Sequence, residues 1–233
     1  MRVVSTHHQH GQTICEHDFP DEASSLVNTL SLLEPPVYQI DGFDETSRPK
    51  KPKRQMRPLP GVGRKPFLMP VDQSSMNKAI SRALRTDGWS SEPVAAGPMA
   101  SPETPLGLKG DFVRNGVFVE VEFGNVASMH RDFFKFQIAN RAGAGAVGVL
   151  IVATDRLARF FDSGVATFEI ASKSRPFLAI GVQMPIWIIG IEPDDFEFAI
   201  GPRYREMWEL CRSNGVECHP WEDALGAPAV VDA

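Results

Sequence analysis

The sequence lacks paired cysteines. Its three cysteines, Cys15, Cys211 and Cys218, are an odd number without CxxC spacing. A disulfide framework needs cysteine pairs and a zinc ribbon needs closely spaced ones, so both kinds of stabilised small fold are excluded. We therefore expect a chain that works in a reducing, cytoplasmic setting.

The sequence also lacks a long hydrophobic run. Its most apolar stretch, residues 142–153, is interrupted by glycine. That stretch falls short of the roughly 18–20 residues that a membrane-spanning helix needs. The N-terminus has no signal-peptide core. We expect an unsecreted protein with no membrane partner.

Positive charge is not in excess, because 29 Asp and Glu outnumber 24 Lys and Arg. The formal net charge of −5 argues against non-specific coating of nucleic acid, although it leaves room for a local basic groove. With 233 residues, 42% of them hydrophobic, the chain can bury a sizeable core. We expect a single domain over residues 1–233.

A basic, proline-rich segment covers residues 46–66. Its prolines prevent helical packing, so we expect an exposed, mobile loop or linker. Its lysines and arginines could follow a phosphate backbone, but a solvated linker explains them equally well.

Apolar spacing predicts the regular elements of the chain. Helices are expected over residues 21–33, from Ser74-Ser75 to Gly88, over 128–142 and over 204–213, with buried strands at 147–153 and 186–191. The N-terminal histidines, His7, His8, His10 and His17, could suggest a metal site, but a polar terminal tail is the better interpretation.

A hairpin centred on Asn115-Gly116 carries the main chemical signal. Asn-Gly is a strong indicator of a two-residue type I′ turn, which fixes the pairing of the two strands. In this register Arg114 faces Val117, and Asp111 falls directly opposite Glu120.

Glu122 projects from the same face as Glu120, two residues further along. The alternate residues form an apolar face toward the core: Val117, Val119, Val121 and Phe123. The carboxylates are thereby left on the opposite, polar face. Like charges directly opposite each other are destabilising unless something offsets them, and a divalent cation is the natural remedy. The simpler alternative is an acidic surface hairpin that keeps the protein soluble.

Magnesium suits this arrangement, since it prefers oxygen ligands and needs only one or two carboxylates plus substrate phosphate. A bound metal lowers the pKa of its water and orients it for attack on phosphorus. The sequence thus predicts a Mg²⁺-dependent nuclease with Asp111, Glu120 and Glu122 as catalytic and metal-binding residues.

These residues resemble a known family. Asp111 followed after nine positions by Glu120, within Val-Glu-Val-Glu-Phe-Gly-Asn at 119–125, is similar to the active-site segment of the BglII and BstYI type II restriction endonucleases of the PD-(D/E)XK superfamily. Three further segments support the resemblance, which covers roughly residues 70–195: 77–89, 162–169 and 184–186.

The resemblance implies an α/β fold with a restriction-endonuclease-like core, in which helices flank a central mixed β-sheet. It also implies a homodimer that cuts both strands of a short palindrome in double-stranded DNA, centred on GATC in its best-known members. A prokaryotic cytoplasm and a cognate DNA methyltransferase of the same restriction-modification system follow, because an unprotected host would be cut.

Further site residues follow from the resemblance. Glu92 would be an auxiliary acidic residue of the catalytic site, and Asn125 and Ser163 would contact bases, although turn and cap roles explain these two equally well. Lys109 and Arg114 are expected to contact phosphates.

One departure concerns Glu122, which stands where BglII and BstYI carry glutamine and where lysine is common in the superfamily. Glu122 either positions the water or binds a second ion. Two alternatives to a restriction enzyme remain: a non-catalytic DNA-binding protein and a structure-specific repair nuclease of the same fold.

Overall fold

The computed structural model describes residues 1–37, 56–58, 66–95, 108–161 and 164–226. At its centre is a six-stranded mixed sheet in the order β1-β8-β7-β6-β5-β4. The strands are β1 (Arg2–His8), β4 (Ser90–Ser91), β5 (Phe112–Arg114), β6 (Val117–Val121), β7 (Val147–Ala153) and β8 (Ile186–Glu192). β6, β7 and β8 run parallel, whereas the outer pairs are antiparallel.

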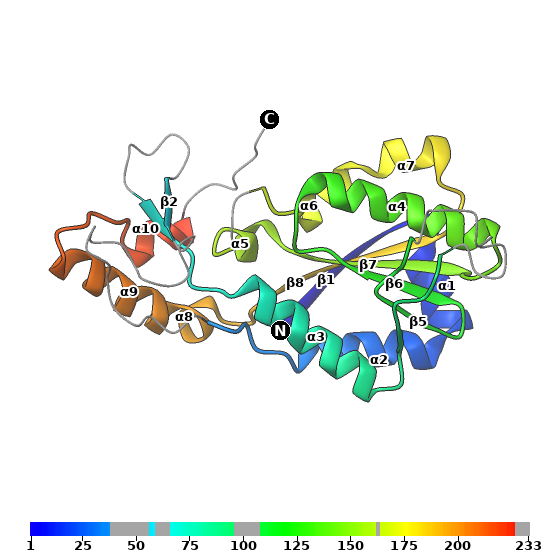
Figure 1. The fold of residues 1–233 in the computed structure, drawn as a ribbon, viewed down its shortest axis with the longest axis horizontal. Coiled ribbons are helices and arrows are strands. Elements are labelled where there is room, and N and C mark those ends of the chain that lie inside the picture. The colour runs from blue at the N-terminus through cyan, green and yellow to red at the C-terminus, as the bar shows by residue number, and fades with distance from the viewer. Residues whose placement is uncertain (38–55, 59–65, 96–107, 162–163, 227–233) are drawn as a thin grey trace.

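Helices cover both faces of the sheet, which confirms the predicted fold class (Figure 1). One face carries α1 (Gly11–Asp18), α2 (Pro20–Ser31) and α3 (Gln73–Thr86). The other carries α4 (Val126–Arg141), α6 (Phe168–Lys173) and α7 (Arg175–Gly181). Every residue of β7 and β8 is buried, as expected for parallel strands packed on both sides.

A smaller group of elements extends the core beyond one end of the sheet (Figure 1). It comprises β2 (Met56–Pro58), β3 (Pro66–Leu68), α5 (Asp155–Ala158), α8 (Phe196–Ala199), α9 (Gly201–Ser213) and α10 (Trp221–Gly226). Phe160 stacks on Trp221 at a ring-centroid distance of 5.6 Å and meets Tyr204 edge-on at 6.2 Å. Residues 56–58 of the basic segment form β2, which pairs with β3. Residues 46–55 and 59–65 of that segment lie outside the described ranges.

The predicted helices are confirmed as α2, α3, α4 and α9. The start of α3 differs in detail, since Asp72 is its N-cap and accepts hydrogen bonds from the amides of Ser74 and Ser75 at 3.0 and 3.2 Å. A carboxylate can satisfy two free amides at once, which explains this choice of cap. None of the helices in the described ranges is long and apolar enough to cross a membrane.

The prediction of a polar N-terminal tail was wrong. Residues 2–8 form β1, which pairs antiparallel with β8 from Arg2↔Glu192 to His8↔Ile186, and α1 follows. β1 is an edge strand with little burial of its own, so its residues carry only a weak alternating pattern. Its partner lies so far along the chain that no local signal marks the pairing.

The predicted hairpin is confirmed with its register. Asn115 and Gly116 have φ angles of 47° and 90°, as a type I′ turn requires. The ladder pairs Arg114 with Val117, Val113 with Phe118 and Phe112 with Val119, which brings Asp111 to the position opposite Glu120.

Gly116→Ala should lower the free energy of unfolding by about 1–3 kcal/mol, because a side chain at positive φ is strained. Gly181→Ala is the matched control, since Gly181 closes a helix and nothing lies within 4 Å of an added Cβ. Urea unfolding of both variants measures the difference. Equal stabilities would contradict a turn that depends on Gly116.

Candidate active site

Asp111 lies just before β5 and is held against β6. Its Oδ2 accepts a hydrogen bond from the amide of Val121 at 2.7 Å, and its carbonyl accepts one from the amide of Glu92 at 3.0 Å. Burial raises the pKa of Asp111 above its ordinary value, and the Val121 hydrogen bond opposes this shift. The backbone thus fixes one carboxylate oxygen beside the end of β6.

Glu120 is the most deeply buried carboxyl group of the hairpin, with 1% exposure. Its Oε2 accepts a hydrogen bond from Nζ of Lys135 at 2.9 Å, whereas its Oε1 is buried without a hydrogen-bond partner among the described residues. Burial, followed by the charges of Asp132 and Asp111, raises the pKa of Glu120 to about 8, while Lys135 lowers it. One oxygen is therefore paired and the other is left without a partner in the part of the chain that the structure describes.

Glu122 has different contacts. Its Oε1 accepts a hydrogen bond from the amide of Gly124, and its carboxyl group lies near that of Asp132. Burial, reinforced by the charge of Asp132, raises the pKa of Glu122 to about 7. Glu122 can therefore gain or lose a proton near neutral pH.

Helix α4 lies over the carboxylates, so the face expected to be polar is a buried layer. Phe136 of α4 packs edge-on against Phe118 of β6 at a ring-centroid distance of 6.4 Å. Lys135 forms ion pairs with Glu120 and Asp132, both at 2.9 Å. Burial lowers the pKa of Lys135, but its hydrogen bonds to the two carboxylates outweigh this effect and raise it. We call Asp111, Glu120, Glu122, Asp132 and Lys135 the carboxyl cluster.

Sequence reasoning missed Asp132 and Lys135. Their signal was present, because both residues adjoin Phe133 and Phe136 on the helix expected to face the core. Charged residues are almost never fully buried without partners, so charges on that face call for opposite charges on the strand beneath. Glu120 of the hairpin is the opposite charge for Lys135, and Lys135 in turn pairs with Asp132 on the same helix.

Lys109 lies two positions before Asp111, and the amide of Glu92 is hydrogen-bonded to the Asp111 carbonyl, but the side chains of Lys109 and Glu92 make a separate contact. Nζ of Lys109 and Oε2 of Glu92 form an exposed ion pair at 3.1 Å. Arg114 lies at the turn end of β5, where Nε contacts Oε1 of buried Glu22 at 3.0 Å. The structure does not bring Arg114 to the carboxyl cluster.

Asn125 caps α4, since its Oδ1 accepts a hydrogen bond from the amide of Ser128 at 3.0 Å. Its side chain is exposed just beyond Glu122 and Gly124. Ser163 lies outside the described residues.

The donors of the carboxyl cluster fit a hard divalent cation. Carboxylate oxygens are the ligands that magnesium prefers, and the buried, unpartnered Oε1 of Glu120 is one such donor. Within the described ranges, no three His, Cys, Asp or Glu side chains come together in an arrangement that could hold a metal ion. Since magnesium needs only one or two carboxylates beside phosphate and water, Asp111 and Glu120 meet its requirement as a pair.

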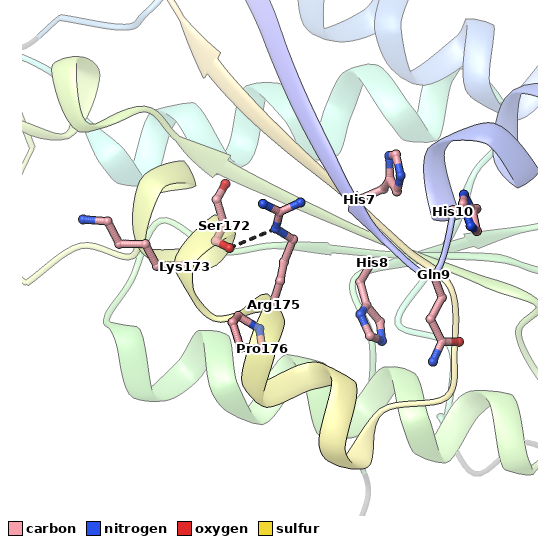
Figure 2. Close-up of a pocket in the computed structure, with 8 residues that line it drawn as sticks. All are labelled: His7, His8, Gln9, His10, Ser172, Lys173, Arg175 and Pro176. Carbon is pink, nitrogen blue, oxygen red and sulfur yellow. Dashed lines mark hydrogen bonds between the residues drawn. The ribbon is translucent and has the colours of Figure 1, made fainter.

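A separate pocket of about 650 Å³ lies where β1 meets α6 and α7 (Figure 2). Its lining is basic and polar: His7, His8, Gln9, His10, Ser172, Lys173, Arg175 and Pro176. Because no carboxylate lines it, this pocket lacks the donor set found in the carboxyl cluster. Of the N-terminal histidines, His7, His8 and His10 thus line a groove distinct from the cluster, whereas His17 does not.

Comparison with known proteins shows which family and which solved structures the chain is similar to. Residues 3–191 match the family model described as restriction endonuclease BglII/BglIII. The fold is similar to restriction endonuclease BglII complexed with a DNA 16-mer, with TM-score 0.58, 19% identity and coverage of 83% of this chain and 78% of that chain. The structure of free BglII is similar with TM-score 0.54 and 16% identity, and the match covers 83% of this chain and 81% of that chain. No curated protein matches the chain.

The stability of the metal-free protein should fall as pH rises from about 5 to 8. The pKa of Glu120 is raised from 4.5 to about 8, so the folded chain keeps a proton that the unfolded chain releases. The stabilisation is complete below pH 4.5 and is lost as pH passes through about 8. Melting temperatures in EDTA measure the trend.

Glu120→Gln should make this slope shallower, because glutamine does not titrate. Glu209→Gln, at an exposed position on α9, is the control and should keep the original slope. A melting temperature that does not change with pH in the unaltered protein would contradict this account of the cluster.

Proposed function

Because the chain belongs to the restriction endonuclease BglII/BglIII family, we propose that it cuts both strands of a short DNA palindrome in a Mg²⁺-dependent reaction. Family membership makes the chain a type II restriction endonuclease, a DNA hydrolase. The observation that carries the metal-dependent proposal is Oε1 of Glu120, a buried carboxylate oxygen left without a partner opposite Asp111.

Asp111 and Glu120 are the proposed metal ligands, and Glu122 is the proposed third catalytic residue. Bound magnesium supplies a polarised water and neutralises charge that develops on the phosphate. Glu122 would position that water and accept its proton, in agreement with a pKa raised to about 7. Glu92, one hydrogen bond away from the Asp111 backbone, is proposed as an auxiliary acidic residue.

Double-stranded DNA is the proposed substrate, because the similar BglII structure is a complex with a DNA 16-mer. Lys109 and Arg114 would contact phosphates, and Asn125, which is exposed, would contact bases together with Ser163. A site centred on GATC and a cognate methyltransferase in a prokaryotic cytoplasm complete the proposal. The methyltransferase would protect the host DNA and need not touch this enzyme.

A homodimer is proposed because cutting both strands of a palindrome calls for two symmetric sites. α4 and α7 expose large apolar side chains on the outside of the same helical layer: Phe134, Phe177 and Ile180, at 68, 74 and 86% exposure. The amide of Gln183, just after α7, donates a hydrogen bond to Gln137 of α4, which ties the two helices together. This pair of helices is the proposed dimer surface.

Purified protein with Mg²⁺ should cut phage DNA into discrete fragments, and EDTA should stop the reaction. Glu120→Ala should lower the cleavage rate about a hundredfold or more, since a catalytic metal is worth several kcal/mol in the transition state. Glu209→Gln should cut normally. Gel electrophoresis of timed digests measures the rates.

Uncut phage DNA beside an active control nuclease would contradict the proposal. DNA binding that is unchanged by Mg²⁺ would then favour a non-catalytic binding protein. Digestion of branched DNA without discrete fragments from linear DNA would favour a structure-specific repair nuclease.

Phe177→Arg should weaken dimer formation about tenfold or more, because a charge replaces apolar contact area at the proposed interface. Phe198→Arg is the matched control, since Phe198 is 83% exposed on α8. Sedimentation equilibrium measures the dissociation constants. A monomeric unaltered protein, or equal effects of both substitutions, would contradict this surface.

A further inference from the structure

The two oxygens of Glu120 have different environments. Oε2 accepts the hydrogen bond from Lys135 at 2.9 Å, and Oε1 has no hydrogen-bond partner among the described residues. Oε1 lies on the side of Gly110, where an added Cβ would sit 3.1 Å from it. The ring of Phe118 fills that position, so only glycine fits there. Asp111, the next residue, lies opposite Glu120 in the hairpin register.

Lys135 is held in place by more than Glu120. It is buried on the inner face of α4 and forms a second ion pair with Asp132, one helical turn away, at 2.9 Å. Phe133, Phe136 and Ala139 fix that face of α4 in the core. The ammonium group is therefore positioned by a rigid helix rather than by a flexible surface side chain.

If Lys135 served only to neutralise the carboxyl groups, the cluster would still have more negative than positive groups. The cluster has four carboxyl groups: Asp111, Glu120, Glu122 and Asp132. Lys135 contacts Glu120 and Asp132, and exposed Arg131 lies 3.9 Å from Asp132. Two positive charges beside four acidic groups leave room for a further cation. The ammonium group also contacts only one oxygen of Glu120, which leaves the other available.

We propose that Lys135 is a positioning residue of the cleavage site, which holds Oε2 of Glu120 so that Oε1 stays available to the divalent cation beside Asp111. The hairpin cannot supply a positive charge at the position two residues after Glu120, because Glu122 stands there. Helix α4 supplies it instead. This inference rests on the proposed metal-dependent function. It assigns to Lys135 the orientation of Glu120, a proposed metal ligand.

Lys135→Met tests the inference, since methionine keeps much of the apolar volume but cannot donate to Glu120. The probe is Mn²⁺, titrated without DNA, with the free ion followed by its electron paramagnetic resonance signal. The affinity should fall about 10–100-fold, as is typical when a partner that orients a metal ligand is lost. Lys135→Arg should recover part of it, because a guanidinium can still donate to both carboxylates.

Lys78→Met is the matched control, because Lys78 is an exposed lysine on α3, across the sheet. It should leave Mn²⁺ affinity unchanged. Equal affinities of Lys135→Met and the unaltered protein would overturn the proposal, and so would tighter binding, which would make Lys135 a competitor of the metal.

If Lys135→Met does not fold, Lys135→Arg provides the test, because a guanidinium keeps the buried charge but cannot place it on Oε2 of Glu120 as the ammonium group does. Its Mn²⁺ affinity should fall below that of the unaltered protein, and an equal or higher affinity would overturn the proposal. The proposed function fails separately, if the unaltered protein binds no Mn²⁺ or leaves DNA uncut.

Discussion

The ammonium group of Lys135 is the interaction on which the arrangement of the site depends. Burying a carboxylate without a partner costs several kcal/mol, and this protein buries Glu120 and Asp132 between a strand and a helix. Lys135 contacts both at 2.9 Å and thereby allows α4 to lie over β6. The position of the helix, the burial of the hairpin and the electrostatics of the site are thus linked through one side chain.

The opposite face of β6 has a simpler role. Val117, Val119 and Phe123 pack into the core formed with α1, α2 and α3. The amide of Glu122 donates a hydrogen bond to the carbonyl of Ile151 at 2.9 Å, which ties the end of β6 to the fully buried strand β7. The acidic residues therefore project from a strand that is fixed on one face by apolar packing and along its length by parallel pairing.

Local patterns predicted the hairpin well because its determinants are local. Asn115 and Gly116 set the turn, the turn sets the register, and the register brings Asp111 opposite Glu120. Helices α2, α3, α4 and α9 followed from apolar spacing for the same reason. The family resemblance supplied the fold class, which spacing alone could not.

Two features were beyond local reasoning. β1 pairs with a strand almost 200 positions away, and its own residues alternate only weakly. α4 lies over the carboxylates because Phe136 packs against Phe118, a contact between two separate elements. Without that contact, the sequence pointed to a metal as the only group that neutralises the carboxylates, and Lys135 was overlooked. Short-range rules identify which residues share a face, but they do not reveal what lies above that face.

The carboxyl cluster also has a consequence for the order of folding. All its members lie between Asp111 and Lys135, in a hairpin and the helix that directly follows it. Because the entropy cost of closing a loop grows with its length, these contacts can form soon after the segment is synthesised. The pairing of β1 with β8 must wait until residues 186–192 exist. The charged layer can therefore assemble first, and the edge of the sheet closes around it last.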